Sequence, residues 1–163
     1  KIFFPLLSAD GKIIVVTSEV APLDPLPFTG LYGVTKCALD RYAFALGMEL
    51  QLLDISVSVL RAGAVSTGML GASTDALTAF CEKTALYRCN AARFRRIVDS
   101  VEAKSVPPER IAKKVLHILG AKRPAFAYAI NRNPLLRLLN LLPKRMQLWA
   151  IRLVLREKAD KHG

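Results

Sequence analysis

The sequence predicts an α/β fold, in which parallel strands are covered by helices as in a doubly wound sheet, followed by a helical extension. Two observations support this prediction. Apolar runs with several β-branched residues occur at 12–17 and 55–60, and both are short enough to be buried parallel strands. Between them, from about residue 31 to residue 53, apolar residues recur at helical spacing. Strand, helix and strand in this order are the repeating unit of such a sheet.

The segment between the first strand and this helix must be a loop, because Pro22, Pro25 and Pro27 interrupt both strand and helix. The helix carries one apolar stripe that we expect to be buried. The stripe consists of Ala38, Leu39, Tyr42, Ala43, Leu46 and Leu50. Packing on the sheet accounts for part of this stripe, and contact with a second copy of the chain is the alternative for the rest.

Start and stop signals place the later elements. These elements are a helical stretch at 76–101, a helix from about 107 to 120, a strand at about 125–130 and a helical hairpin within 135–158. Pro107 is typical of a helix start, Gly120 of a helix end, and Pro143 would break the hairpin. We therefore expect a main part at 1–133 and a basic amphipathic tail at 134–163.

Three polar side chains around the first loop have a chemistry that fits together. Ser18 lies where the first strand stops, and Tyr32 and Lys36 lie one turn apart on the helix after the loop. A free phenol has a pKa of about 10, and an ammonium group nearby favours its ionised form. Such a phenol exchanges a proton near neutral pH, and a neighbouring hydroxyl holds the oxygen that receives it. The trio suits protonation of an alkoxide that forms from a carbonyl, or the reverse.

A tyrosine followed one turn later by a lysine also occurs by chance, so the pair alone is weak. Its context is more specific. A strand that ends in Thr17-Ser18, a proline-rich loop, the Tyr32 and Lys36 helix, another strand and then the segment 61–67 (RAGAVST) form an ordered series. This series resembles the second half of the short-chain dehydrogenase/reductase family, whose members use a Ser, a Tyr-x-x-x-Lys and a Pro-Gly-x-Val-x-Thr segment. The resemblance covers roughly residues 1–70 well and the remainder loosely.

The resemblance implies a Rossmann-like sheet, of which 1–133 is the C-terminal, catalytic half, and reversible hydride transfer between NAD or NADP and a carbonyl or secondary alcohol. Ser18, Tyr32 and Lys36 would be catalytic: Tyr32 as general acid and base, Lys36 beside it, and Ser18 orienting the substrate oxygen. Tyr32 and Lys36 would also bind the cofactor. The remaining cofactor contacts that the resemblance implies are Gly63, Val65 and Thr67.

The sequence departs from the family pattern at two positions. Ala62 replaces the usual proline before Gly63, which removes some rigidity from that loop. The family serine commonly lies one residue nearer to the tyrosine than Ser18 does, at the position held here by Glu19. We assign the role to Ser18 because it follows the strand as the family serine does, and the proline-rich loop can absorb an extra residue.

The glycine-rich turn that binds a dinucleotide pyrophosphate has no counterpart in the sequence, which starts without Met at Lys1. If the family assignment holds, the chain is the C-terminal part of a longer polypeptide and is inactive alone. The residues that select NAD or NADP would then lie upstream, so that choice stays open.

The formal net charge is +11, but the basic residues are spread over the second half rather than interleaved with aromatic residues, so we expect no nucleic-acid partner. Cys37, Cys81 and Cys89 show neither CxxC spacing nor partner histidines at metal spacing, so we expect no metal site. Unpaired, scattered cysteines suit a reducing compartment, and we expect a cytoplasmic protein, peripheral to a membrane if the tail binds one.

Apolar residues in the region 68–105 and in the tail favour a hydrophobic substrate, and the resemblance implies a homo-oligomer. The tail has no apolar run of the roughly 18 residues needed to cross a bilayer, but one apolar side with Trp149 is suited to a membrane surface. The alternative hypothesis for the whole chain is therefore a non-catalytic fragment, or a basic amphipathic module that binds a membrane or a partner.

Overall fold

The structure is a computed structural model that describes residue 7 and residues 9–156, except the side chains of residues 69–74, 88 and 89. Its contacts group the chain into two units. The first comprises the residues up to Gly63 together with Pro107–Asn133, and the second comprises Ala64–Val106 together with the residues from Pro134 onward. The division at residue 133 into a catalytic half and a tail stays a prediction.

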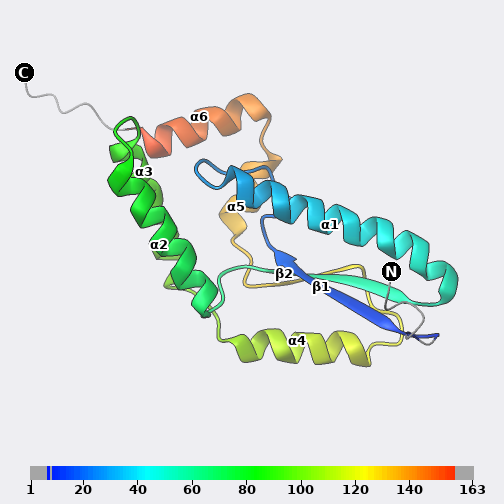
Figure 1. Cartoon of the computed structure of the whole chain (residues 1–163). Coiled ribbons are helices and arrows are strands. Elements are labelled where there is room, and N and C mark those ends of the chain that lie inside the picture. The colour runs from blue at the N-terminus through cyan, green and yellow to red at the C-terminus, as the bar shows by residue number, and fades with distance from the viewer. Residues whose placement is uncertain (1–6, 8, 157–163) are drawn as a thin grey trace, which may run out of the picture. The chain divides into compact units, whose positions relative to one another are not determined.

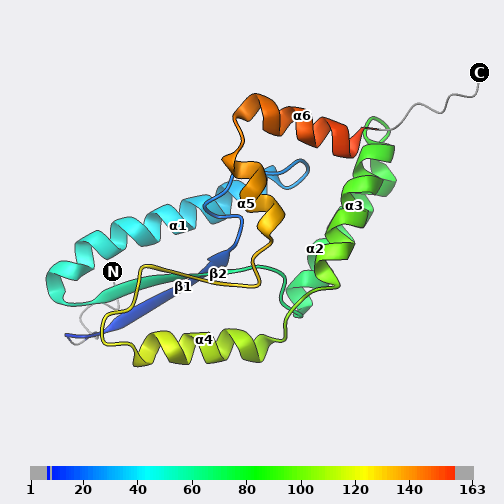
Figure 2. The same cartoon turned by 180° about the vertical axis from the view of Figure 1, so that it is seen from behind.

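The first unit is a three-layer α/β structure. Its parallel sheet has the order β1-β2-β3, and helices α1 and α4 lie on opposite faces of it (Figures 1 and 2). The bounds are β1 Lys12–Ser18, α1 Gly30–Leu50, the short 3-10 helix η2 Gln51–Leu53, β2 Ser56–Ala62, α4 Pro108–Gly120 and β3 Ala127–Ile130. In the register, Ser18 pairs with Ala62 and Ala62 with Ile130. The carboxyl ends of all three strands therefore lie at one edge, which is where parallel sheets bind ligands.

The core of this unit forms because side chains alternate along β2. Val57 and Val59 point to one face, where they pack with Ile55 against Ala43, Leu46 and Leu50 of α1. Ser58 and Leu60 point to the other face, and Leu60 is fully buried, as is Ile118 of α4. A strand buried on both faces explains why 55–60 is an almost continuous apolar run. The predicted Rossmann-like α/β class is confirmed.

The buried face of α1 differs from the predicted stripe. Ala43, Leu46 and Leu50 are buried as predicted, but Tyr42 is 59% exposed and Ala38 is also exposed. Asp40 is buried instead, as is Gly33. The prediction was wrong at Tyr42 and Ala38 because it considered only apolar residues. Asp40 forms an ion pair with Arg61 of β2, so the side of α1 that carries Asp40 packs on the sheet.

The second unit is helical. Its helices are α2 Gly68–Lys83, α3 Arg88–Glu102, α5 Pro134–Leu141 and α6 Lys144–Leu155. The single helical stretch expected at 76–101 is therefore two helices, because Thr84 is extended and its hydroxyl accepts a hydrogen bond from the Tyr87 N–H at 3.3 Å. The break predicted at Pro143 is confirmed. Within this unit α3 and α6 are joined by the Asn90 side chain, which donates to the Leu155 carbonyl at 2.7 Å.

The other predicted elements are confirmed with shifted ends. The first strand continues to Ser18, the second to Ala62, and the last begins at Ala127. Across the described part of the chain, every helix is too short or too polar to traverse a lipid bilayer.

Candidate active site

Ser18 lies at the carboxyl edge of the sheet as the last residue of β1. Its side chain is buried, and Oγ accepts a long hydrogen bond of 3.4 Å from the Val20 N–H. The chain then turns, because the Ala21 N–H donates to the Ser18 carbonyl at 3.0 Å and Ala21 is buried at the turn. The strand-end hydroxyl is thus held by its own loop, as serines in tight turns commonly are.

Tyr32 and Lys36 meet on the first turns of α1. The Lys36 Nζ lies 5.5 Å from the centroid of the Tyr32 ring, within the range of a cation–π contact. The Tyr32 side chain is 48% exposed. The structure therefore brings this pair together, with the phenol accessible to a molecule that approaches α1.

The proline-rich loop packs back onto the start of α1. Gly33 is buried there, and a Cβ added to it would lie 3.3 Å from the Pro25 Cβ, tighter than most such contacts. A glycine is therefore favoured at this position, directly after Tyr32. The loop and the Tyr32 turn are thereby fixed to each other.

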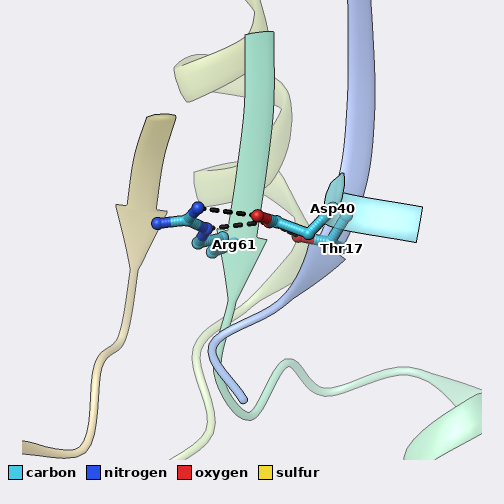
Figure 3. Close-up of polar contacts among 3 residues, drawn as sticks. All are labelled: Thr17, Asp40 and Arg61. Carbon is cyan, nitrogen blue, oxygen red and sulfur yellow. Dashed lines mark hydrogen bonds and ion pairs between the residues drawn. The ribbon is translucent and has the colours of Figure 1, made fainter. Parts of the chain in front are cut away.

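An ion pair that sequence reasoning missed ties α1 to the sheet (Figure 3). Arg61 of β2 donates from Nε to Asp40 Oδ1 at 2.9 Å and from Nη2 to Asp40 Oδ2 at 2.8 Å, and the Thr17 hydroxyl of β1 donates to Oδ1 at 3.5 Å. The side chains of Arg61 and Asp40 are only 16% and 8% exposed. Two-point pairing of this kind fixes orientation as well as distance. The signal available in the sequence was an aspartate within an apolar helix and an arginine directly after an apolar strand.

Gly63 follows β2, and its position explains why it is glycine. Its N–H donates to the Ile130 carbonyl at 2.9 Å, and a Cβ added to it would lie 2.0 Å from the Asn131 carbonyl oxygen. The close approach expected at Gly63 is therefore made at least in part by the chain's own backbone.

Glu19 is the first residue after β1. Its N–H donates to the Ala62 carbonyl at 2.8 Å, so it prolongs the pairing of β1 with β2. Burial raises the pKa of the Glu19 carboxyl above its ordinary value, although a hydrogen bond from the Asn133 N–H and the positive charge of Arg132 act in the opposite direction. Glu19, at the position where the family usually has serine, is thus a partly buried acidic residue.

Val65 and Thr67 belong to the second unit. Val65 forms an isolated parallel bridge with Val106, and Thr67 is exposed directly before α2. Their contacts with a cofactor stay a prediction.

The sheet and its carboxyl edge define a Rossmann-like fold, and comparisons with known proteins agree. A family model described as short chain dehydrogenase matches residues 2–78. The chain is 26% identical over 149 residues to the 3-ketodihydrosphingosine reductase of Bacteroides thetaiotaomicron, covering 88% of this chain and 53% of the relative. It is 27% identical over 138 residues to the NADPH-dependent 3-dehydrocapnine reductase of Ornithobacterium rhinotracheale, covering 83% and 48%.

Two further comparisons extend this result. The mouse 17-beta-hydroxysteroid dehydrogenase type 1 is 30% identical over 119 residues, covering 71% of this chain and 34% of the relative. A crystal structure of a short-chain dehydrogenase from Streptomyces avermitilis shares the fold, with a TM-score of 0.56 at 19% identity over 74% of this chain and 42% of that one. The chain therefore belongs to the short-chain dehydrogenase/reductase family, and it spans about half the length of the first two relatives.

Members of this family generally use NAD or NADP, and the donor groups on the first unit suit such a cofactor. A phenol and an ammonium group on one exposed helix turn can hydrogen-bond to ribose hydroxyls. The residues present therefore fit a ribose of such a cofactor.

Proposed function

We propose that the protein carrying this chain is an NAD(P)-dependent oxidoreductase that interconverts a carbonyl and a secondary alcohol. The observation that carries the proposal is the Lys36 ammonium group against the ring of the accessible Tyr32, on a helix tied to the sheet by Asp40 and Arg61. When bound, the nicotinamide supplies the hydride acceptor or donor. The chain's own residues then have to position the substrate oxygen and move one proton.

In this proposal Tyr32 Oη gives its proton to the substrate oxygen when a carbonyl is reduced, and takes it back when an alcohol is oxidised. Lys36 provides the positive charge beside the phenol and a donor for the nicotinamide ribose. Ser18 orients the substrate oxygen from the end of β1, and Gly63, Val65 and Thr67 contact the nicotinamide end of the cofactor. These roles follow from the family motif, and the Tyr32–Lys36 contact supports those of Tyr32 and Lys36.

We further propose a hydrophobic substrate. The relatives with which the chain aligns are named for ketodihydrosphingosine, dehydrocapnine and hydroxysteroids, and the first two are named as reductases. These names support a ketone on a lipid-like or steroid-like molecule. The choice between NAD and NADP is a further outcome of the assay below.

The test is the consumption of NADH or NADPH by the full-length protein with a panel of long-chain and steroid ketones. Tyr32→Phe should lower kcat/KM by about 10²-fold or more, the usual effect of losing a general acid. Tyr42→Phe is the matched control, since Tyr42 lies on the same helix and is 59% exposed, and the variant keeps the aromatic ring and loses only the hydroxyl. Equal activity of the two variants would exclude Tyr32 as the proton donor.

A homo-oligomer is part of the proposal. The outward side of α1 carries exposed apolar residues that a second copy of the chain would cover. These residues are Leu31, Val34, Tyr42, Phe44 and Met48. Light scattering on the full-length protein tests this, and a monomer at micromolar concentration would contradict it. A cytoplasmic location stays a prediction.

A second candidate function is attachment of the tail to a membrane surface. Trp149 and Leu148 of α6 are 62% and 72% exposed, beside the basic Lys144 and Arg145. Such a face suits an anionic bilayer. Sedimentation with anionic vesicles that is reversed by salt would support it, and equal sedimentation with neutral vesicles would contradict it.

A further inference from the structure

Glu19 joins the end of β1 to the end of β2 and to the segment after β3. Its backbone N–H donates to the carbonyl of Ala62, the last residue of β2, at 2.8 Å. Its side-chain Oε2 accepts from the N–H of Asn133, which follows β3, at 2.6 Å. Glu19 is therefore hydrogen-bonded to the last residue of β2 and to the segment after β3, although Asn133 is more than a hundred residues further along the sequence.

The side chain of Glu19 also passes beside Gly63. A Cβ added to Gly63 would lie 3.1 Å from Glu19 Oε1 and 2.0 Å from the Asn131 carbonyl oxygen. Asn131 has a positive φ of 54°, and this turn carries the chain from β3 toward Asn133. The Glu19 carboxyl and the turn after β3 thus both lie close to the Gly63 backbone, on the side where a side chain would project.

A carboxyl group is well suited to this place. The Asn133 N–H is partly buried, so losing its acceptor would be costly, and a carboxylate makes the stronger kind of hydrogen bond to it. A serine side chain is two bonds shorter and would not span the same gap from the end of β1. The positive charge of Arg132, next to Asn133, further favours an acid here.

We propose that Glu19 is a positioning residue, whose carboxyl group clamps the end of β1 to the segment after β3 and thereby fixes the backbone of Gly63 at the nicotinamide end of the crevice. The link to the cofactor rests on the proposed function; the clamp itself does not. The opposing interpretation is that Glu19, at the family's serine position, acts directly on the substrate oxygen.

The clamp is tested first without any assay of activity. Amide hydrogen exchange at Asn133 in the full-length protein should quicken by about tenfold or more in Glu19→Ala and Glu19→Ser, which lose the acceptor. Glu19→Gln should stay within about threefold of the unchanged protein, because an amide oxygen also accepts. Glu109→Gln is the control for loss of one negative charge, since Glu109 is exposed on α4. Equal exchange in all four variants would overturn the clamp.

The link to catalysis is tested by steady-state kinetics. Glu19→Ala and Glu19→Ser should raise the KM for the cofactor by about tenfold with a smaller change in kcat, and Glu19→Gln should restore the unchanged KM. A Glu19→Ser variant that keeps or raises kcat/KM would overturn the proposal in favour of a direct role at the substrate. If the protein without substitutions showed no activity, the proposed function and the cofactor link would both be overturned. The exchange experiment would still test the clamp.

Discussion

Arg61 and Asp40 form a two-point ion pair that joins the carboxyl-terminal half of β2 to the middle of α1. Asp40 lies one turn beyond Lys36, and Arg61 lies two residues before Gly63. The pair therefore sits between the helix that carries the proposed proton donor and the strand end that leads to the proposed cofactor segment. It fixes how far α1 can slide or turn on the sheet, because both oxygens of Asp40 are engaged.

Removing one partner of this pair should be costly. Asp40→Ala leaves the Arg61 guanidinium largely buried without a counter-charge, and we expect a loss of about 3 kcal/mol in the free energy of unfolding. Urea denaturation of the full-length protein measures it. The control is Asp99→Ala, which removes an exposed pair with Arg95 at 3.9 Å and should cost less than about 1 kcal/mol. Similar losses in the two variants would show that burial of Asp40 is unimportant.

Gly63→Ala should destabilise the fold through a direct clash. The new methyl group would lie 2.0 Å from the Asn131 carbonyl oxygen, and relief requires a backbone shift that we expect to cost about 1–3 kcal/mol. Gly120→Ala is the matched control, because a Cβ there meets nothing within 4 Å. Thermal melting of the two variants should therefore shift in clearly different amounts, and a neutral Gly63→Ala would contradict the observed packing.

Stability should depend on pH through Glu19. Because burial raises the pKa of the folded carboxyl above 4.5, the folded state holds the proton more tightly than the unfolded chain. The contribution of Glu19 is therefore most favourable below the unfolded pKa and is lost as pH rises through the folded pKa. Glu19→Gln removes this dependence, so its free energy of unfolding relative to the unchanged protein should increase from acid toward neutral pH. Urea titrations at several pH values measure it, and parallel pH profiles would contradict the expected burial.

Lys36→Met should impair cofactor binding and proton transfer together. The variant loses the charge beside the Tyr32 ring, and we expect kcat/KM to fall by about 10²-fold, comparable with loss of a general acid–base partner. Lys122→Met is the control, since Lys122 is exposed after α4. Kinetics with saturating substrate and varied cofactor measure both effects. If Lys36→Met retained activity and Lys122→Met lost it, the role proposed for Lys36 would be excluded.

Much of the first unit follows from the sequence alone. Two β-branched apolar runs determine two parallel strands, but only β2 is buried on both faces. The expected burial of β1 was wrong over most of its length, since β1 is mostly half-buried and Val16 is 49% exposed. The prolines at 22, 25 and 27 determine the loop, and the one-turn spacing of Tyr32 and Lys36 determines that their side chains meet. These are local properties of the chain, so patterns of a few residues are sufficient to predict them.

Tertiary structure decided the rest, since it depends on partners far away in the sequence. Whether Asp40 is buried depends on Arg61, so a stripe defined by apolar residues missed Asp40 and wrongly included Tyr42. Whether Glu19 is a surface acid or a link between strand ends depends on Asn133, more than a hundred residues further on. A local pattern cannot predict such contacts, because only the parallel sheet brings the ends of β1, β2 and β3 to one edge.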